Sequence, residues 1–243
     1  MNLAWALLIG VFVGFVGGMF GKGGSAIATP LLFLAGASSI VAVASPLPAT
    51  IPATVLAAWQ YRRAGALDRP LITRVLTFGV PATIVGAYLT RYIGGHVLIV
   101  LTEVLMLGLG LRLLMRPTSD AGGPDPVEGW PVVAVALGAG FAAGLLANSG
   151  GFLLAPLFIT VLRRPAKTAF GTSLAAAAVL AIPGTIVHTA LGHVDWSITI
   201  AFALGSIPFA TIGARVALRS RSEHLERLFG AFLTTSALLF LGG

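Results

Sequence analysis

The sequence has no cysteine and few charged residues, and both absences restrict what it can be. Without cysteine there is no disulfide and no cysteine-based metal site. Only 9% of its residues are charged, whereas a soluble domain of average composition carries about 25%. Runs of about 18 or more mostly apolar residues recur along the chain, which is typical of membrane-spanning helices. We therefore predict an all-α polytopic membrane protein.

Sequence motifs for nucleotide-driven or metal-dependent chemistry are missing as well. There is no G-x-x-x-x-G-K-[ST] motif, and histidines and carboxylates do not recur at metal-ligand spacing. We expect no cofactor and no metal. The net charge is +7, but the arginines stand in short loops, where they orient a protein in the bilayer. The expected partner of this charge is therefore the lipid bilayer and not a nucleic acid.

The chain contains an internal duplication. GFVGGMFGKGGSAIATPLLF (14–33) aligns with GFAAGLLANSGGFLLAPLFI (140–159) at a constant offset of 126 residues, and one inserted residue extends the match. The further matched pairs are Ser45 with Thr172, Gly65 with Gly192, Asp68 with Asp195, Pro81 with Pro208 and Gly86 with Gly213. We predict a first repeat (1–116), a polar cytoplasmic linker (117–129) and a second repeat (130–243) within one transmembrane domain.

Each half divides into five apolar segments. They are 3–20, 25–36, 43–61, 71–92 and 97–115, then 131–147, 151–162, 168–190, 196–217 and 227–241. The second segment of each half would reach only about 18 Å, against about 30 Å of hydrocarbon. If it forms a hairpin with the first, all lysines and arginines except Lys22 and Arg91 fall on one side, as the positive-inside rule requires. This predicts an inverted repeat of two five-segment halves in the cell (inner) membrane, each a short-helix hairpin followed by three spanning helices, with both termini outside the cytoplasm.

Glycine-rich breaks precede the two short segments, GKGGS (21–25) and ANSGG (147–151). Inverted repeats with interrupted helices are typical of secondary transporters, whose substrate lies where the helices break. The N-terminus of a short helix offers free N–H groups and partial positive charge, and glycine lets a ligand approach the backbone. The alternative is that the glycines only permit close helix packing. The predicted anion-binding residues are Lys22, Gly23, Gly24, Ser25, Asn148, Ser149, Gly150 and Gly151.

Several other polar residues stand within apolar segments. Glu103 is either a proton-coupling group or a counter-charge for Lys22, or else it makes a structural hydrogen bond to a neighbouring helix. His188 is either a gate or proton carrier or an interfacial residue without such a role. Thr172 and Ser173 either line the substrate cavity or bond back to their own helix.

Other residues are expected to shape the helix ends. We expect Asp68 and Asp195 to cap the helices that follow them. Tyr61 reads as an anchor at the membrane interface. Pro46, Pro48 and Pro52 should bend the third segment near its outer end.

The paired motifs resemble a known family. G-x-x-G-x-G-G-S (18–25) and G-x-x-A-N-S-G-G (144–151), each followed by an apolar-Pro-Leu run, resemble the TauE/SafE sulfite exporter family of membrane transporters. AFGTSL (169–174), the G-x-x-D of 192–195 and the Gly213-Ala214 pair add to the likeness, which covers nearly the whole chain. The family usually has an apolar residue where this chain has Lys22.

This resemblance implies a function in transport. The expected activity is secondary transport of a small anion, often sulfur-containing (sulfite, a sulfonate or a sulfoacetate-like acid), by alternating access and without enzymatic activity. A passive anion channel and an intramembrane enzyme are the alternatives. The residues do not determine the direction of transport, whether protons are the coupling ion, or whether the chain forms a homodimer.

Overall fold

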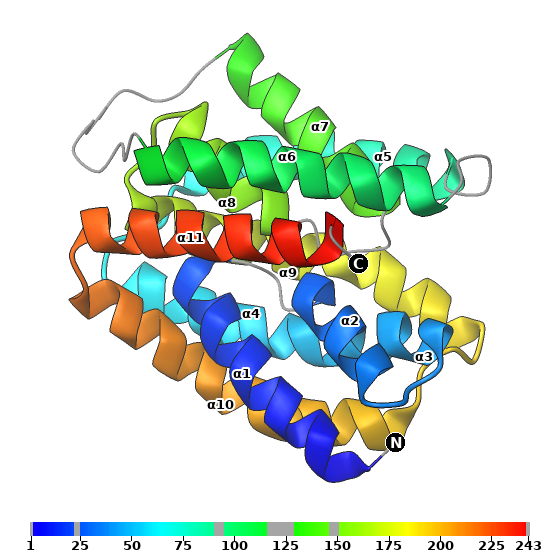
Figure 1. The fold of residues 1–243 in the computed structure, drawn as a ribbon. Helices are drawn as coiled ribbons and strands as arrows, with labels where there is room; N and C mark the ends of the chain where they lie inside the picture. The colour runs from blue at the N-terminus through cyan, green and yellow to red at the C-terminus, as the bar shows by residue number, and fades with distance from the viewer. Residues whose placement is uncertain (1, 22–24, 90–94, 116–128, 146–150, 242–243) are drawn as a thin grey trace.

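The computed structural model describes residues 2–21, 25–89, 95–115, 129–145 and 151–241, and every regular element in these ranges is a helix (Figure 1). In chain order the helices are α1 (Leu3–Phe20), α2 (Ser25–Leu34), α3 (Ser39–Ala44), α4 (Pro46–Arg63), α5 (Arg69–Leu89), α6 (Gly95–Met115), α7 (Trp130–Leu145), α8 (Gly151–Thr160), α9 (Ala166–Ala190), α10 (Trp196–Arg219) and α11 (Ser222–Leu241). Almost all of the predicted linker lies outside the described residues.

Four stretches of the described chain are long and apolar enough to cross a membrane. They are α1, the stretch Ser39–Arg63 that contains α3 and α4, α9 and α10. The tryptophans at or near the starts of α1, α7 and α10 (Trp5, Trp130 and Trp196) are exposed, as expected for residues of an interfacial belt. The chain is an all-α polytopic membrane protein, as predicted.

The third predicted segment, 43–61, is interrupted at the first of the three prolines that were expected to bend it. The structure divides it into α3 and α4 at Ser45, and Pro46 opens α4. Proline suits the first turn of a helix because its fixed φ is already helical and its missing N–H needs no partner there. The same missing N–H interrupts the hydrogen-bond ladder that would join the two helices.

Close backbone contacts between helices repeat in the two halves. A Cβ on Gly14 of α1 would collide with the carbonyl oxygen of Ser206 in α10, and a Cβ on Gly140 of α7 would collide with that of Gly79 in α5. These contacts are counterparts, because Gly14 matches Gly140 and Ser206 matches Gly79 across the duplication. Small residues allow such close approach between membrane helices. Each half therefore packs its first helix against the fourth predicted segment of the other half.

Each of the remaining long helices packs against the matching helix of the other half. α4 packs against α9, and α6 lies beside α11, which Figure 1 shows as the two long helices across the front. α9 contributes to the main apolar core through Phe170 and Leu174, among other buried residues. The opposite orientation of the two halves in the bilayer remains a prediction.

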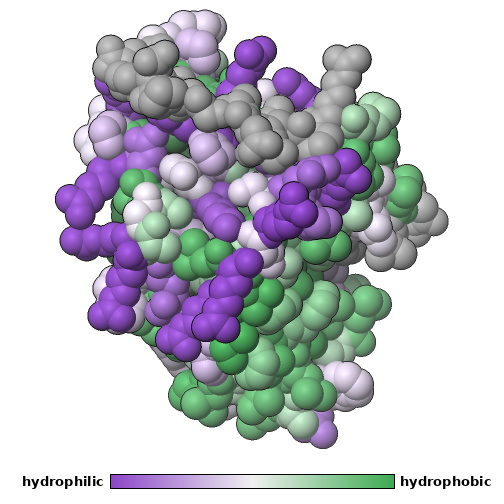
Figure 2. Space-filling view, turned by 90° about the vertical axis from the view of Figure 1, so that its left-hand side faces the viewer, coloured by the Kyte–Doolittle hydropathy of each residue, from purple (hydrophilic) through white to green (hydrophobic). Residues whose placement is uncertain are grey.

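Hydrophilic side chains gather on one face of the molecule. Figure 2 looks at the left-hand side of Figure 1 and shows them over its upper and left part, with hydrophobic side chains at the lower right. The turn from α10 to α11 lies at this left-hand end, and it carries the exposed Arg219 and Arg221. Both chain ends lie on the right-hand side of Figure 1. The turn from α10 to α11 and the two chain ends therefore lie on opposite sides of this view.

Candidate functional site

Both short helices begin at the end of a glycine-rich break. α2 starts at Ser25 and α8 at Gly151, and each has 10 residues. At about 1.5 Å per residue each helix spans about 15 Å, about half of a hydrocarbon core of about 30 Å. The predicted binding residues that lie outside the described residues are Lys22, Gly23, Gly24, Asn148, Ser149 and Gly150. The two short helices begin at Ser25 and Gly151, as the sequence predicted.

The end of α1, just before the first break, is fixed by side chains from other helices. Gly21 ends α1 in the left-handed conformation, with φ +68°, and its N–H donates to the Gly17 carbonyl. The hydroxyl of Ser173 donates to the Gly21 carbonyl at 2.8 Å and contacts the Phe170 carbonyl at 2.9 Å. The carbonyl groups that a helix C-terminus leaves free are thus partly satisfied by another helix. The structure places Ser173 directly against the entrance of the first break.

Tyr61 holds the same helix end from α4. Its hydroxyl donates to the carbonyls of Gly18 and Met19, at 3.0 and 3.1 Å, and the residue is fully buried. The expectation of an interfacial anchor at Tyr61 is therefore wrong. A tyrosine with one polar atom can be buried when that atom finds an acceptor, and the unsatisfied end of α1 supplies two.

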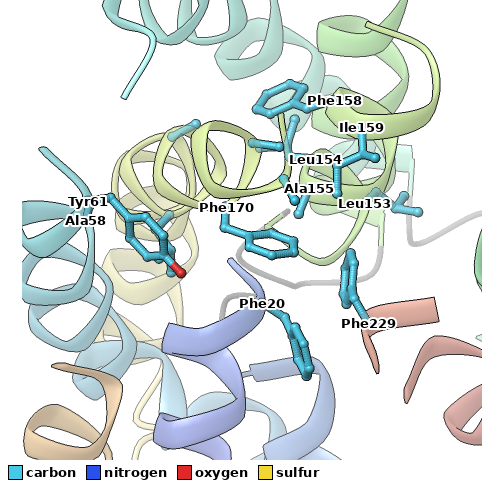
Figure 3. Packing of buried hydrophobic residues seen from close by; sticks show 14 of the residues in the cluster. Phe20, Ala58, Tyr61, Leu153, Leu154, Ala155, Phe158, Ile159, Phe170 and Phe229 are labelled. Carbon is cyan, nitrogen blue, oxygen red and sulfur yellow. The ribbon is translucent and has the colours of Figure 1, made fainter. Parts of the chain in front are cut away.

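Three phenylalanines pack where α1 ends. Figure 3 shows Phe20 facing Phe170 of α9 and Phe229 of α11. Phe20 and Phe229 stack at 5.3 Å between ring centroids, and Phe170 meets Phe229 edge-on at 5.3 Å. Aromatic pairs in these geometries contribute about 0.5–1.5 kcal/mol beyond their burial. The cluster ties the first break to α9 and to the last helix.

Thr172, the neighbour of Ser173, makes a different contact. Its hydroxyl accepts a hydrogen bond from the Asp68 backbone N–H at 3.0 Å. The Asp68 carboxylate in turn accepts from the N–H of Leu71 at 3.0 Å and pairs with Arg164 at 2.9 Å. We call Thr172, Asp68 and Arg164 the Asp68 corner. The predicted cap of α5 is confirmed, and the hydroxyl of Thr172 is engaged by the loop that precedes α5.

The matching residues of the other half make the matching contact. The Asp195 backbone N–H donates to the hydroxyl of Ser45 at 3.0 Å. The Asp195 carboxylate accepts from the N–H groups of Ser197 and Ile198 at the start of α10, which confirms the second predicted cap. We call Ser45 and Asp195 the Asp195 corner. Each corner joins the two halves of the chain.

Glu103 and His188, the predicted coupling or gating residues, lie on different helices. Glu103 stands within α6, and its side chain is outside the described part of the structure. His188 lies in the last turn of α9, half-buried, with its Nδ1 3.2 Å from the Nδ1 of His193. No described contact joins His188 to Ser173 or to the end of α1, so the structure groups it with the Asp195 end of the molecule.

A cleft opens beside the end of α1, between α1, α4 and α10. Its volume is about 20 Å³, which is room for about one water molecule. Its polar residues are Thr50 and Thr54 of α4 and Ser206 of α10, and no charged side chain is among its described lining residues. Gly18, whose carbonyl accepts from Tyr61, is in its wall. In the sequence, Gly18 precedes Lys22 by four residues.

The family model described as "Sulfite exporter TauE/SafE" matches residues 6–240. This chain belongs to that family. A "Probable membrane transporter protein" of Xylella fastidiosa (strain 9a5c) is 30% identical over 94% of this chain and 91% of its own length. The "Probable membrane transporter protein YjnA" of Bacillus subtilis (strain 168) is 24% identical over 96% of this chain and 97% of its own length. No solved structure matches the chain. The protein is a multi-pass membrane transporter of the TauE/SafE type.

The contacts of three residues of this TauE/SafE chain are revealed only by the structure. Tyr61, Arg164 and Ser206 each sit against a residue more than 40 positions away in the sequence. The duplication gave no signal for Arg164, since its first-half counterpart is Ala37 or Ser38, depending on where the inserted residue is placed. For Ser206 the signal was its mismatch with Gly79, a hydroxyl where the other repeat has none. Among the described residues no group of histidines and carboxylates could hold a metal ion.

Proposed function

We propose that this chain is a secondary carrier of a small sulfur-containing anion, such as sulfite, a sulfonate or a sulfoacetate-like acid. The observation that carries the proposal is that two half-length helices, α2 and α8, begin at the ends of the two glycine-rich breaks. Helix N-termini bind anions through free N–H groups and the positive end of the helix dipole. The family name, which refers to sulfite export, supports the choice of a sulfur oxyanion.

Specific side chains would complete the anion site. Lys22 supplies a full positive charge in the first break, and Asn148 supplies neutral donors in the second. Ser25 and Gly151 contribute the first backbone N–H groups of the two short helices. Ser173 holds the carbonyl of Gly21 and so fixes the entrance of the first break.

The counterpart contacts between the halves support alternating access. Carriers built from repeats work by rocking one set of helices against the other around a central site. Here α1 packs on α10 and α7 packs on α5 through equivalent glycine contacts. The two arrangements that a rocking motion exchanges would then have similar packing and similar free energy.

Transport measured in proteoliposomes tests this function. The purified chain should take up labelled sulfite or sulfoacetate with saturation, and unlabelled anion inside should accelerate uptake by counterflow. Uptake that never saturates and shows no counterflow would indicate the passive channel instead. The absence of uptake for every sulfur anion, in vesicles that hold correctly folded protein, would overturn the proposal.

The orientation in the inner membrane has its own test. We propose that the hydrophilic face shown in Figure 2 is cytoplasmic and that both termini are outside the cytoplasm, because loops rich in arginine are retained inside. Fusing a phosphatase that is active only outside the cytoplasm to either end should give active enzyme in both cases. Activity at one end only would mean that the chain crosses the membrane an odd number of times. That result would contradict the predicted inverted repeat.

A further inference from the structure

One exposed face of α4 is apolar until the last turn of the helix, where it becomes basic. Val55 and Trp59 are 50% and 41% exposed. Arg62 and Arg63 are also exposed, and they follow Val55 by seven and eight residues, a spacing that keeps side chains on one face of a helix. α4 therefore presents an apolar stripe that ends in two cations.

α10 has the same arrangement at its end. Ile212 and Val216 are exposed, and the exposed Arg215 and Arg219 lie three and seven residues after Ile212 on the same face. Both helices belong to the stretches that are long and apolar enough to cross a membrane. Exposed apolar side chains on such a helix contact lipid chains, whereas arginine side chains near its end reach the headgroup region.

The two basic ends lie side by side. The Nε of Arg215 donates to the Oε1 of Gln60 at 3.4 Å, and Gln60 stands one helical turn before Arg63 in α4. At their other ends the two helices are joined by the contact of Ser45 with Asp195. α4 and α10 thus run in the same direction, and their arginines gather at one end. Figure 2 views the end of the molecule where α10 finishes, and there hydrophilic side chains adjoin a hydrophobic surface.

The guanidinium groups at this end keep hydrogen-bond donors for a ligand. The Cζ of Arg63 lies 3.6 Å from the centre of the Trp59 ring, which is a cation–π contact. This contact uses the flat face of the guanidinium and leaves the N–H groups at its edge, and Arg215 contacts Gln60 through Nε alone. Guanidinium edges bind phosphate through paired hydrogen bonds.

Carboxylates do not neutralise this cluster of arginines. Asp68 pairs with Arg164, and Glu223 pairs with Arg227. Within the described ranges, no ion pair involves the arginines at the ends of α4 and α10. An excess of positive charge beside an exposed apolar surface matches the chemistry of an anionic phospholipid, which has a negative phosphate and apolar acyl chains.

We propose that the ends of α4 and α10 form a binding site for an anionic phospholipid. Arg63 and Arg215 hold its phosphate, and its acyl chains lie along the exposed apolar faces of the two helices. Basic pockets between membrane helices bind lipid head groups in this way. The lipid bridges the two repeats, because α4 belongs to the first and α10 to the second. The inference goes beyond the proposed transport function and does not depend on which anion the chain carries.

Native mass spectrometry of the purified full chain in mild detergent gives the first test, with phosphatidylglycerol and phosphatidylcholine as probes. Arg63→Gln and Arg215→Gln should each weaken the binding of phosphatidylglycerol about fivefold, the factor that corresponds to about 1 kcal/mol per arginine. Neither variant should change the binding of phosphatidylcholine. Arg227→Gln is the matched control, because it removes an exposed arginine of α11 that pairs with Glu223, and it should leave both affinities unchanged.

Two results of this experiment would overturn the site. One is equal affinity of the wild type for the two lipids, and the other is a loss in Arg227→Gln as large as that in Arg63→Gln. Inorganic phosphate and glycerol 3-phosphate, added at the concentration of the lipid, should not displace phosphatidylglycerol. If they displace it, the arginines bind a free phosphate and not a lipid.

Trp59 reports the occupation of the site by its fluorescence. The other three tryptophans, Trp5, Trp130 and Trp196, are exposed, so their replacement by phenylalanine should leave the fold intact. In that chain, brominated phosphatidylglycerol should quench Trp59 at a lower lipid fraction than brominated phosphatidylcholine. A chain that keeps Trp196 alone is the matched control, since this residue opens α10 at the opposite end of the helix. The two lipids should quench Trp196 equally.

The fluorescence also distinguishes a lipid from a second copy of the chain. Equal quenching of Trp59 by the two brominated lipids would contradict a site selective for negative charge. The absence of quenching by either lipid, in a chain that the mass spectra show to be dimeric, would mean that a second copy covers this face. That result would overturn the lipid site as well.

Discussion

The Asp68 and Asp195 corners share one backbone arrangement and differ in charge. In each, an aspartate caps a long helix and its own N–H donates to a hydroxyl of the opposite half, Thr172 or Ser45. Among the described residues, only Asp68 of the two has a cation, Arg164, with the Arg164 and Asp68 side chains 10% and 14% exposed. No described cation pairs with Asp195. The Asp195 corner instead has a hydrogen bond of its own, because the Thr199 hydroxyl donates to the Ser45 carbonyl at 2.8 Å where the first repeat has Ile72. The two corners thus share the aspartate cap and its hydroxyl contact, and they differ in what else joins the halves.

The largest effect is expected from a variant that breaks only the ion pair between Asp68 and Arg164. Asp68→Asn keeps the helix cap, since asparagine caps as well as aspartate, but leaves Arg164 without its carboxylate. Removing one partner of a nearly buried pair should lower the free energy of unfolding by about 3 kcal/mol. Asp195→Asn, the matched control, should change it by less than about 0.5 kcal/mol because no described ion pair is lost. Equal losses in chemical unfolding of the two variants would contradict the comparison.

A loss of stability of intermediate size is expected, and it should be the same at both corners. Thr172→Val and Ser45→Ala each leave an aspartate N–H without its acceptor. A buried donor left unpaired costs about 1–3 kcal/mol. Thermal unfolding should therefore show comparable losses for the two variants. If Thr172→Val is harmless while Ser45→Ala is not, the corners are not equivalent even in their hydrogen bonds.

The smallest expected effect concerns the histidines beside Asp195. His193 lies two residues before Asp195 but contacts His188, and its ring makes no described ion pair with the carboxylate. His193→Gln should therefore change the free energy of unfolding by no more than about 0.5 kcal/mol. A loss as large as that of Asp68→Asn would show that His193 acts at this corner as Arg164 does at the other.

The sequence predicted the helices well because membrane helices are long apolar runs with polar boundaries. It also placed the two aspartate caps, because a cap is a local contact read from a few residues. It also predicted a disturbance at Pro46, where the structure divides the third segment between α3 and α4 although the apolar run continues. It misjudged Tyr61, since the carbonyls that accept from its hydroxyl, those of Gly18 and Met19, lie more than 40 positions away in the sequence.

The candidate site was predictable only in its local part. The starts of α2 and α8 follow from glycine runs in the sequence. The pairing of Arg164 with Asp68 and the placement of Ser206 against Gly14 join residues about 100 or more positions apart. The ion pair has no counterpart in the other repeat, so the duplication could not supply it, whereas the contact of Ser206 with Gly14 matches that of Gly79 with Gly140.

Thermal stabilisation by anions tests the central claim, that the glycine breaks bind the substrate. The wild type would be compared with Lys22→Ala and Asn148→Ala against sulfite, sulfate, thiosulfate, sulfoacetate, taurine, acetate and chloride. An anion at about 100 times its dissociation constant should add about 2.7 kcal/mol to the stability of the wild type. We expect one sulfur anion to do so and Lys22→Ala to abolish the shift. A shift that persists undiminished in both variants would show that the anion binds elsewhere and that the glycines serve helix packing alone.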